Sequence, residues 1–372
     1  MSKHALLSAS SSHRWLNCPP SALKCAAAPN QSSEYARQGT AAHELCQFKV
    51  EKALGRNVRD PTEDLDYYDD EMEDCAEQYC SYVLEQLAEA KRHCKDPMIF
   101  VEQRLDFSHW VPEGFGTGDC VIVADDILQI IDYKHGVGVL VDADMNPQML
   151  CYALGAVELF DGIYDIHKVR TSIFQPRRSN ISTFELSKEE LLRWADEVLA
   201  PTARLAYQGE GEYKAGSHCQ FCSVKASCRK RAEYNLELAK YDFAMPSELT
   251  TEEIDVILGK ADELVSWAND IKEYALQQAL SGTDFSNYKV VAGRSITRYT
   301  DEAAVADAVT KLGLEPYEKK LLGITAMRSL LGKRQFEEVL GSLTVKPPGK
   351  PTLVPRSDKR PEYNNAKTDF TE

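Results

Sequence analysis

The chain has 372 residues, of which 43% are hydrophobic and 27% are charged. This composition is typical of a soluble globular protein and excludes a wholly disordered, collagenous or coiled-coil chain. At roughly 150 residues per domain, the length predicts about two domains. The apolar runs fall short of the roughly 18 residues that span a bilayer, and residues 5–7 are too short an apolar stretch for a signal peptide. We therefore expect a cytoplasmic protein with no membrane partner.

The net charge of −15 is unevenly distributed. Residues 60–89 contain twelve acidic side chains and no Lys or Arg, so the remainder of the chain carries a net charge of only −3. That remainder can present local basic surfaces. The acidic segment is either a solvated helix face with its leading loop or a charge that repels or gates a polyanion.

Helix and strand patterns alternate over the first 240 residues. Residues 8–31, rich in Ser, Pro, Ala and Cys, predict mostly irregular chain. Asn146 and Pro147 form a strong helix start, an N-cap followed by proline at the first helical position. Predicted helices cover residues 39–54, 71–92, 146–160, 187–208 and 251–280, and predicted strands cover 99–105, 116–134 (a hairpin), 169–175 and the region near 288–299. Two short helices and a Pro- and Lys-rich, weakly ordered tail (346–372) complete the chain.

The predicted hairpin 116–134 is the most informative segment for function. Two runs of β-forming residues flank Asp125-Asp126, and Asp tolerates turn conformations. With a two-residue turn there, Asp119 lies directly opposite Asp132, and Lys134 shares the face of Asp132. Like charges at opposite positions, about 4.5–5.5 Å apart at Cβ, are destabilising. A divalent cation would neutralise them; alternatively, one Asp lies in solvent at a frayed strand end, or a slipped register separates the two.

Four more polar residues fall near this pair in the predicted arrangement. Glu102, at the start of an adjacent strand, would add a third carboxylate. Gln148 and Tyr152 are four residues apart on the following helix and therefore share one face. His43 lies on the first predicted helix. Taken singly, each is ordinary surface polarity or a satisfied histidine, but together with the carboxylate pair they favour a site.

These residues resemble the motifs of the PD-(D/E)XK nuclease superfamily, specifically its RecB-like exonuclease branch. The resemblance covers residues 39–160 and implies an α/β fold, with a central mixed sheet flanked by helices and a smaller, mainly helical C-terminal region. The whole chain also resembles a family of phage and prophage proteins found near replication and recombination genes. The matching motifs, in the order of the family, are Gly39-Thr-x-x-His43, Gly118-Asp119, Asp132-Tyr-Lys134 and Gln148-x-x-x-Tyr152.

The resemblance implies two domains and a catalytic set. Residues 1–240 would form a RecB-like nuclease domain, and 241–372 a helical or α+β accessory region that ends in the tail. In the first domain, bound metal would lower the pKa of water and stabilise charge on the phosphate. The implied ligands of Mg²⁺ or Mn²⁺ are His43, Asp119 and Asp132, with Glu102 as a further catalytic carboxylate and Lys134 to orient or activate the attacking water.

The implied DNA contacts lie beside and beyond these residues. Gln148 and Tyr152 would hold a DNA phosphate or brace the site. A basic cluster would contact phosphates in a sequence-independent, salt-sensitive mode, or is a solvated loop; it comprises Lys168, Arg170, Arg177 and Arg178. A second candidate surface would stack on unpaired bases or pack against neighbouring helices; it comprises Tyr288, Arg294, Arg298 and Tyr299.

Eleven cysteines, an odd number in a reducing compartment, favour metal ligation over disulfides. Cys219, Cys222 and Cys228 supply three thiolates at close spacing, and a tetrahedral site needs a fourth, Cys18 or alternatively Cys25. Iron–sulfur nucleases of the superfamily have the same order, one cysteine before the core and three after it, which implies a [4Fe–4S] cluster. Zinc and unligated core cysteines are the alternatives. A cluster here would close a loop of about 200 residues and is expected to be structural.

The resulting hypothesis is a metal-dependent DNA exonuclease with a [4Fe–4S] cluster, acting in phage-type recombination or replication. The preference for exonuclease over endonuclease comes from the resemblance alone. One alternative is a catalytically silent DNA-binding or partner-recruiting protein on a nuclease fold, and another is a zinc-clipped structural factor. Expected partners are DNA and a phage single-strand-binding or annealing protein, and a homo-oligomer is compatible with the sequence.

Overall fold

The structure is a computed structural model in which the chain divides into two compact units, Met1–Gln277 and Gln278–Glu372. It describes residues 5–28, 34–237, 249–292, 299–317 and 321–345. The first unit extends beyond residue 240 and includes most of helix α9 (Thr251–Leu280). Buried Arg231, on α8 (Arg229–Leu236), explains this extension, because its guanidinium pairs with Asp270 of α9. The domain boundary expected at residue 240 stays a prediction.

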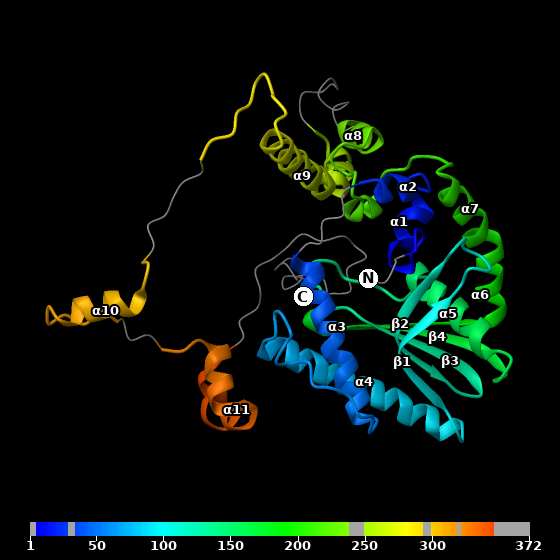
Figure 1. Cartoon of the computed structure of the whole chain (residues 1–372), viewed down its shortest axis with the longest axis horizontal. Coiled ribbons are helices and arrows are strands. Elements are labelled where there is room, and N and C mark those ends of the chain that lie inside the picture. Colours follow the sequence, from blue (N-terminus) through cyan, green and yellow to red (C-terminus); the bar gives the residue numbers. More distant parts are fainter. Residues whose placement is uncertain (1–4, 29–33, 238–248, 293–298, 318–320, 346–372) are drawn as a thin grey trace, which may run out of the picture. The chain divides into compact units, whose positions relative to one another are not determined.

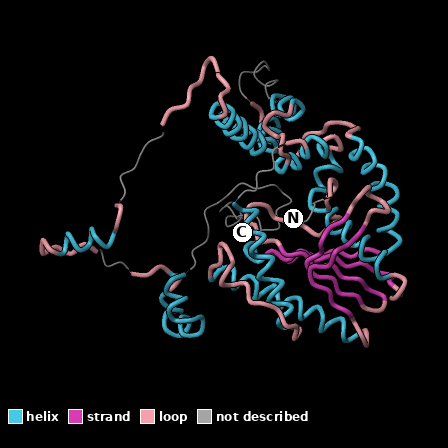
Figure 2. Tube along the Cα trace, in the orientation of Figure 1, coloured by secondary structure: helices cyan, strands magenta, loops and turns pink. Residues whose placement is uncertain are grey.

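A five-stranded mixed sheet forms the centre of the first unit (Figures 1 and 2). The strands lie in sequence order; β3 and β4 are parallel, and all other neighbours are antiparallel. The α/β fold class expected from the sequence is therefore present as a mixed sheet with flanking helices. The strands are β1 (Met98–Asp106), β2 (Phe115–Val123), β3 (Asp126–Tyr133), β4 (Ile166–Gln175) and β5 (Asn180–Ser187).

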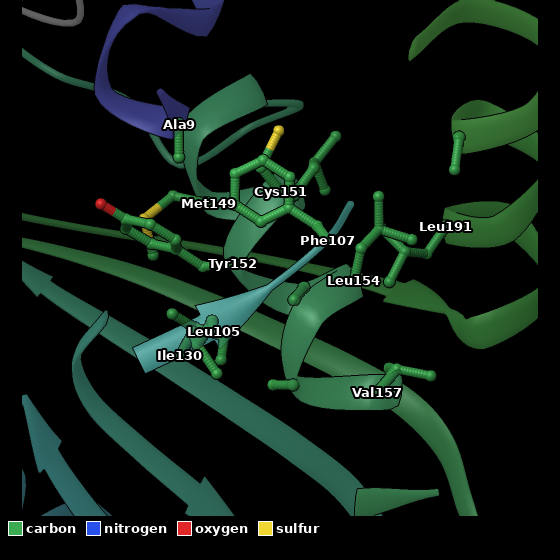
Figure 3. Packing of buried hydrophobic residues seen from close by; sticks show 14 of the residues in the cluster. Ala9, Leu105, Phe107, Ile130, Met149, Cys151, Tyr152, Leu154, Val157 and Leu191 are labelled. Carbon is green, nitrogen blue, oxygen red and sulfur yellow. The ribbon is translucent and has the colours of Figure 1, made fainter. Parts of the chain in front are cut away.

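Each face of the sheet packs against its own set of helices, as expected when strand residues alternate between two buried faces. On one face, Val121 and Ile130 join a core built around α5 (Pro147–Phe160); Figure 3 shows side chains of α5 against Leu105 and Ile130. On the other face, Ile122 and Ile131 join a core with α3 (Glu34–Ala53) and α4 (Asp70–His93).

The predicted hairpin register is confirmed. Cys120 pairs with Ile131 and Val123 with Leu128, and the two-residue turn is closed by reciprocal hydrogen bonds between Ala124 and Ile127. Asp126, inside the turn, adopts a positive φ of 78°, a conformation that Asp accepts more readily than most residues. Continued one residue beyond the Cys120–Ile131 pair, this register places Asp119 opposite Asp132.

Helix α5 begins at its predicted signal, whereas α3 begins at Glu34, before the predicted start at residue 39. The Asn146 side chain caps α5 by accepting from the backbone N–H of Gln148, and Asp69 caps α4 in the same way through Met72. The predicted helix 187–208 forms as three consecutive segments, the middle one with π geometry. They are α6 (Lys188–Trp194), η3 (Ala195–Leu199) and α7 (Ala200–Gln208).

The prediction of irregular chain over residues 8–31 is wrong for its first part. Three short helices form there, η1 (Ala9–Ser11), α1 (Ser12–Asn17) and α2 (Ser21–Ala26). Burial overrides the local sequence preference, because Leu7 and Trp15 are fully buried in the α5 core. The indole N–H of Trp15 donates to the carbonyl of Ser8, which satisfies the one polar atom that this burial encloses.

The second unit contains two helices among its described residues, α10 (Glu302–Thr310) and α11 (Ile324–Leu340), with the 3₁₀ turn η6 (Gly341–Leu343). The predicted strand near 288–299 has no counterpart in its described part, where Tyr288 forms a single bridge with Phe285. Arg294, Arg298 and the tail 346–372 lie outside the described residues. In the part of the chain that the structure covers, no helix is both long and apolar enough to cross a membrane.

Candidate functional site

Five polar side chains meet where strands β1, β2 and β3 adjoin helix α3; His43, Glu102, Asp119, Asp132 and Lys134 are called the carboxylate site below. Ligand atoms of His43, Glu102 and Asp119 all lie within 4.8 Å of one another. Asp132 and Lys134 adjoin this group as an ion pair with 2.8 Å between Oδ2 and Nζ. The sequence predicted this set, and the fold brings all five together.

Asp119 is held in place by hydrogen bonding and charge. Its Oδ2 accepts a 2.7 Å hydrogen bond from the backbone N–H of Tyr133, and its Oδ1 lies 3.2 Å from Nδ1 of His43. Burial acts to raise the pKa of this carboxyl, but His43, Lys134 and the Tyr133 N–H outweigh it and hold the pKa below its usual value. Asp119 is therefore ionised at neutral pH and offers a charged oxygen ligand.

Asp132 is buried almost completely, and its surroundings disfavour the ionised carboxylate more than those of Asp119 do. Burial and the nearby Asp119 carboxylate raise its pKa, although Lys134 opposes the shift. Its Oδ1 accepts a 3.0 Å hydrogen bond from Nε2 of Gln148. Its Oδ2 is enclosed and faces the Lys134 ammonium at 2.8 Å. Asp132 is therefore a buried carboxylate that contacts both Gln148 and Lys134.

Glu102 interrupts strand β1 at the point where it faces Asp119. Ladder pairing runs through Val101 with Cys120 and resumes at Gln103 with Gly118, whereas Glu102 adopts a φ of 51°. A positive φ in a non-glycine strand residue costs of order 1–3 kcal/mol and is concentrated at functional sites. Burial, then repulsion from Asp119, raises the pKa of Glu102 to about 7.

His43 completes the donor group from helix α3. Its ring stacks edge-on against Tyr133, with centroids 5.5 Å apart. Burial lowers the pKa of the imidazole, but the Asp119 carboxylate more than compensates and raises it to about 9. Without a bound cation, the protonated imidazole of His43 therefore neutralises part of the negative charge of the carboxylates.

The donor set fits a hard divalent cation. Carboxylate oxygens with one imidazole are ligands that Mg²⁺ and especially Mn²⁺ accept. The raised pKa of His43 reflects the negative charge of Asp119, whereas that of Glu102 reflects burial first and repulsion from Asp119 second. A bound cation would relieve the repulsion among these carboxylates.

Gln148 and Tyr152 brace the carboxylate site from α5. The Gln148 amide links three neighbours, since Oε1 accepts from Lys134 (3.2 Å) while Nε2 donates to Asp132 and to the Tyr152 hydroxyl (3.2 Å). The Tyr152 ring lies against Gly116 of β2, where a Cβ atom would come within 2.6 Å of the ring. The glycine is therefore needed for this close approach. In the structure these two residues act as positioning groups.

Three arginines of the predicted basic cluster form ion pairs or hydrogen bonds within the protein. Arg177 pairs with Glu71 of α4 at 2.9 Å, and Arg170 pairs with Glu185 of β5 at 2.6 Å. Arg178 donates to the backbone carbonyl of Val137, which belongs to the loop after β3. Arg178 is thus close to the chain that carries Lys134, whereas Arg177 is tied to the acidic segment 60–89.

Cysteines from distant parts of the first unit share one small cavity of about 20 Å³, called the cysteine cavity below. Cys18, Cys219, Cys222 and Cys228 all line it. Cys25 does not line it; its Sγ lies 3.5 Å from Sγ of Cys222. This hydrogen-bonded contact lowers the pKa of Cys25 to about 5. Of the two alternatives considered for the fourth position, the fold places Cys18 in the cavity.

Basic side chains surround the cysteine cavity, a feature that the sequence analysis missed. Arg231 and Lys225 are neutralised by Asp270, and Arg231 also pairs with Glu263. A signal was present in the sequence, because basic residues flank every one of the cavity cysteine segments. The six basic lining residues are Arg14, Lys24, Lys214, Lys225, Lys230 and Arg231.

The spacing of the thiols bears on which group would fit. Zinc held tetrahedrally at about 2.3 Å from each sulfur requires sulfur atoms roughly 3.8 Å apart. Among the described residues, the cysteine cavity holds no three donor atoms within 4.8 Å of one another. The four cavity thiols therefore lack the close spacing of an assembled zinc site, and the basic side chains around them would complement an anionic thiolate-bound group.

Comparisons with known proteins identify a family. The model of the family described as protein of unknown function (DUF2800) matches residues 4–361. The chain belongs to this family. One solved structure that this DUF2800 chain matches is described as the crystal structure of SSO0001. The two are 13% identical with a TM-score of 0.23, and the match covers 52% of this chain and 98% of that one.

Proposed function

We propose that this protein is a Mg²⁺- or Mn²⁺-dependent deoxyribonuclease that hydrolyses phosphodiester bonds at the carboxylate site. The observation that carries the proposal is the convergence of three metal-type donors with an ion-paired lysine. His43, Glu102 and Asp119 lie within 4.8 Å of one another, beside the Asp132–Lys134 pair. A structural ion pair would not require two further carboxylates at this point.

Each residue has a chemical task in this proposal. His43, Asp119 and Asp132 would hold the cation, which when bound supplies Lewis-acid stabilisation of charge developing on the phosphate. Lys134, kept cationic by the Asp132 carboxylate against the effect of burial, orients the attacking water and stabilises negative charge. Gln148 fixes both Lys134 and Asp132, so that the lysine stays aligned as charge changes in the site.

Exonuclease action and a role in phage-type recombination or replication are proposed from the resemblance of the motifs to RecB-like nucleases. In that setting the partners are DNA and a phage single-strand-binding or annealing protein. We further propose that Cys18, Cys219, Cys222 and Cys228 hold a [4Fe–4S] cluster. The support is that all four line one cavity, whose lining also includes basic side chains that would complement an anionic cluster.

The test compares cleavage of linear and circular duplex and single-stranded DNA in Mn²⁺ and Mg²⁺ by the wild type, Asp132→Asn and a matched control. Asp126→Asn serves as that control, because it removes a carboxylate from the exposed turn of the same hairpin, where Asn also tolerates the positive φ. We expect cleavage of linear DNA by the wild type and by the control, and none by Asp132→Asn.

The same experiment separates the rival function. DNA binding without cleavage of any substrate by cluster-replete wild type would contradict the proposal and favour a catalytically silent DNA-binding protein. Cleavage that survives in Asp132→Asn would place the chemistry elsewhere. Degradation of circular as well as linear duplex would retain the nuclease but replace exonuclease by endonuclease.

A further inference from the structure

The loop that joins β3 to α5 exposes apolar side chains beside the carboxylate site. It leaves the sheet directly after Lys134 and ends at the helix that carries Gln148. Residues 136–140 are all exposed, and the three that carry side chains are apolar: Val137 (43% exposed), Val139 (41%) and Leu140 (54%). Three exposed aliphatic residues within four positions are unusual for a solvent loop, which is normally polar.

This loop is held in place by its backbone. Gln175, at the end of β4, is 1% exposed, and both its amide nitrogen and its amide oxygen bond to the loop. Its Nε2 donates to the carbonyls of Gly136 (2.7 Å) and Val139 (2.8 Å), and its Oε1 accepts from the N–H of Val141. Because the backbone polar groups bond toward the sheet, the loop keeps its apolar side chains outward at a fixed position.

Further bonds hold both ends of this segment. Arg178 donates to the carbonyl of Val137 at 3.0 Å, and Asn180 donates to that of Val141 at 2.8 Å. Asp142, the acidic residue that follows, accepts from the Ser182 hydroxyl and from a backbone N–H within the loop. The apolar tip is therefore flanked by a guanidinium on one side, while the acidic residue behind it is engaged with β5.

The geometry points to a partner with an apolar surface next to an anionic one, immediately beside the scissile position. The chain from Lys134 to Val137 spans at most about 11 Å, which is about three base steps of duplex DNA. Aliphatic side chains that insert between bases are a known way of unstacking and opening a duplex. A nucleic-acid end offers both surfaces, because stacked bases are apolar and their phosphates would meet Arg178.

We propose that Val137, Val139 and Leu140 form a wedge that packs against the terminal bases of a DNA duplex and separates them as one strand enters the carboxylate site. This inference rests on the proposed nuclease function and adds a substrate preference, namely that opening of duplex ends depends on the wedge. The loop residues act on the substrate's position and take no part in the hydrolysis.

The test is a triple variant, Val137→Ser, Val139→Ser and Leu140→Ser, beside a control variant, Ile163→Ser. Ile163 is 76% exposed in the turn after α5 and lies on the same unit. All four positions are exposed, so the unfolding midpoints should match the wild type. The substrates are a blunt duplex, the same duplex with four mismatched terminal base pairs at each end, and the single strand, each also carrying 2-aminopurine near its ends.

We expect the triple variant to cleave the blunt duplex about tenfold more slowly, a difference of about 1.4 kcal/mol, because it loses the apolar contact with the terminal bases. Its rates on the mismatched duplex and single strand should stay within about twofold of wild type. In Ca²⁺, binding of the wild type should raise 2-aminopurine fluorescence at the blunt end, and binding of the triple variant should not. The Ile163→Ser control should behave as wild type throughout.

Several results would overturn the wedge. Equal loss on all three substrates would show general damage, and no loss on any would show that the loop does not touch DNA. Loss of a wild-type dimer with unchanged DNA responses would assign the surface to self-association. If the wild type cleaves nothing, yet opens the duplex end in a loop-dependent way, the nuclease proposal fails and the wedge stands; if it neither cleaves nor opens DNA, both fail.

Discussion

The carboxylate site and the cysteine cavity differ in how the chain brings their residues together. Asp119, Asp132 and Lys134 come from a single hairpin, with Gln148 on the helix that follows it directly. The cysteine cavity instead joins Cys18, near the start of the unit, to the segment 219–228 near its end. The first site depends on local strand pairing, and the second depends on the completed fold.

This difference predicts that damage to the two sites has separate consequences. A substitution at the carboxylate site removes a charged or catalytic side chain from a hairpin. The rest of the sheet still supports that hairpin, so the fold should persist. A change at the cysteine cavity releases the contact between distant segments, so the stability of the whole unit should fall. The four predictions below test this separation.

The largest effect is expected from Lys134→Gln. Loss of the charge that positions water and stabilises the phosphate should lower kcat about 10²- to 10⁴-fold. The glutamine keeps a polar side chain near Asp132, and the 400 nm absorption of the cluster should be unchanged. Single-turnover cleavage of linear DNA measures the loss, with Lys188→Gln, a cation paired with Asp161 far along the chain, as the control. A Lys134→Gln enzyme with wild-type kcat would remove the lysine from the chemistry.

Cys219→Ser should act on stability instead. Without a full ligand set the cluster, its iron and its broad absorption near 400 nm should be lost, and the unfolding free energy should fall by about 2–5 kcal/mol, comparable to removal of a native cross-link. Anaerobic purification, iron analysis and urea unfolding measure both effects. Cys80→Ser, a half-buried cysteine on α4, should leave them unchanged. Equal absorption in both variants would contradict the ligand assignment.

Gly116→Ala tests the packing that connects α5 to the carboxylate site. The added Cβ would meet the Tyr152 ring at 2.6 Å, so the ring must shift and should carry the Gln148 contact with it. We expect a loss of about 1–3 kcal/mol in stability, as for other overpacked positions, together with reduced cleavage. Gly39→Ala is the matched control, because its Cβ enters open space on a helix and should be neutral or stabilising. Thermal unfolding that ranks the two variants in the opposite order would contradict this.

Glu102→Gln should give the smallest effect, and one that depends on pH. The folded-state pKa of about 7 lies above the unfolded value of 4.5, so the stability contributed by this group is complete below pH 4.5 and is lost as the pH rises through 7. In metal-free protein the glutamine variant should therefore gain about 1–2 kcal/mol relative to wild type between pH 5 and 8, a value reduced for partial exposure.

Urea unfolding of both proteins in chelator across this range measures that difference. Saturating Mn²⁺ should reverse its sign at pH 8, because the wild-type carboxylate then binds the cation. A difference that stays constant with pH would show that Glu102 does not titrate in the folded state within this window.

Sequence reasoning predicted the local parts of this molecule well. The Asp119–Asp132 register followed from strand alternation and a two-residue turn, and the α5 start followed from Asn146 and Pro147; both are short-range rules. Contacts between residues far apart in the sequence could not be predicted in this way. The helices before residue 27 form because Trp15 is buried against α5, a contact that no local pattern encodes.

The missing details of the site have the same origin. The backbone N–H of Tyr133 that holds Asp119, the positive φ of Glu102 and the pairing of Arg177 with Glu71 are all products of tertiary contact. Residue types in the sequence can predict which side chains supply metal ligands. The pKa values of those side chains, and whether their charges are paired, depend on the neighbours that the fold places beside them. The metal, the cluster and the activity stay predictions for the experiments above.

The closure of the cysteine cavity has a consequence for synthesis on the ribosome. Every residue of the carboxylate site lies between positions 43 and 134, and strand β5 ends at Ser187, so the sheet and its donors can emerge and pair before Cys219 is translated. The earliest helices, by contrast, contribute Cys18 to a cavity that only the segment 219–228 can complete. A nascent chain can therefore hold an assembled carboxylate site while its N-terminal segment is still open, and a cluster bound at the proposed cysteine site would be acquired late in maturation.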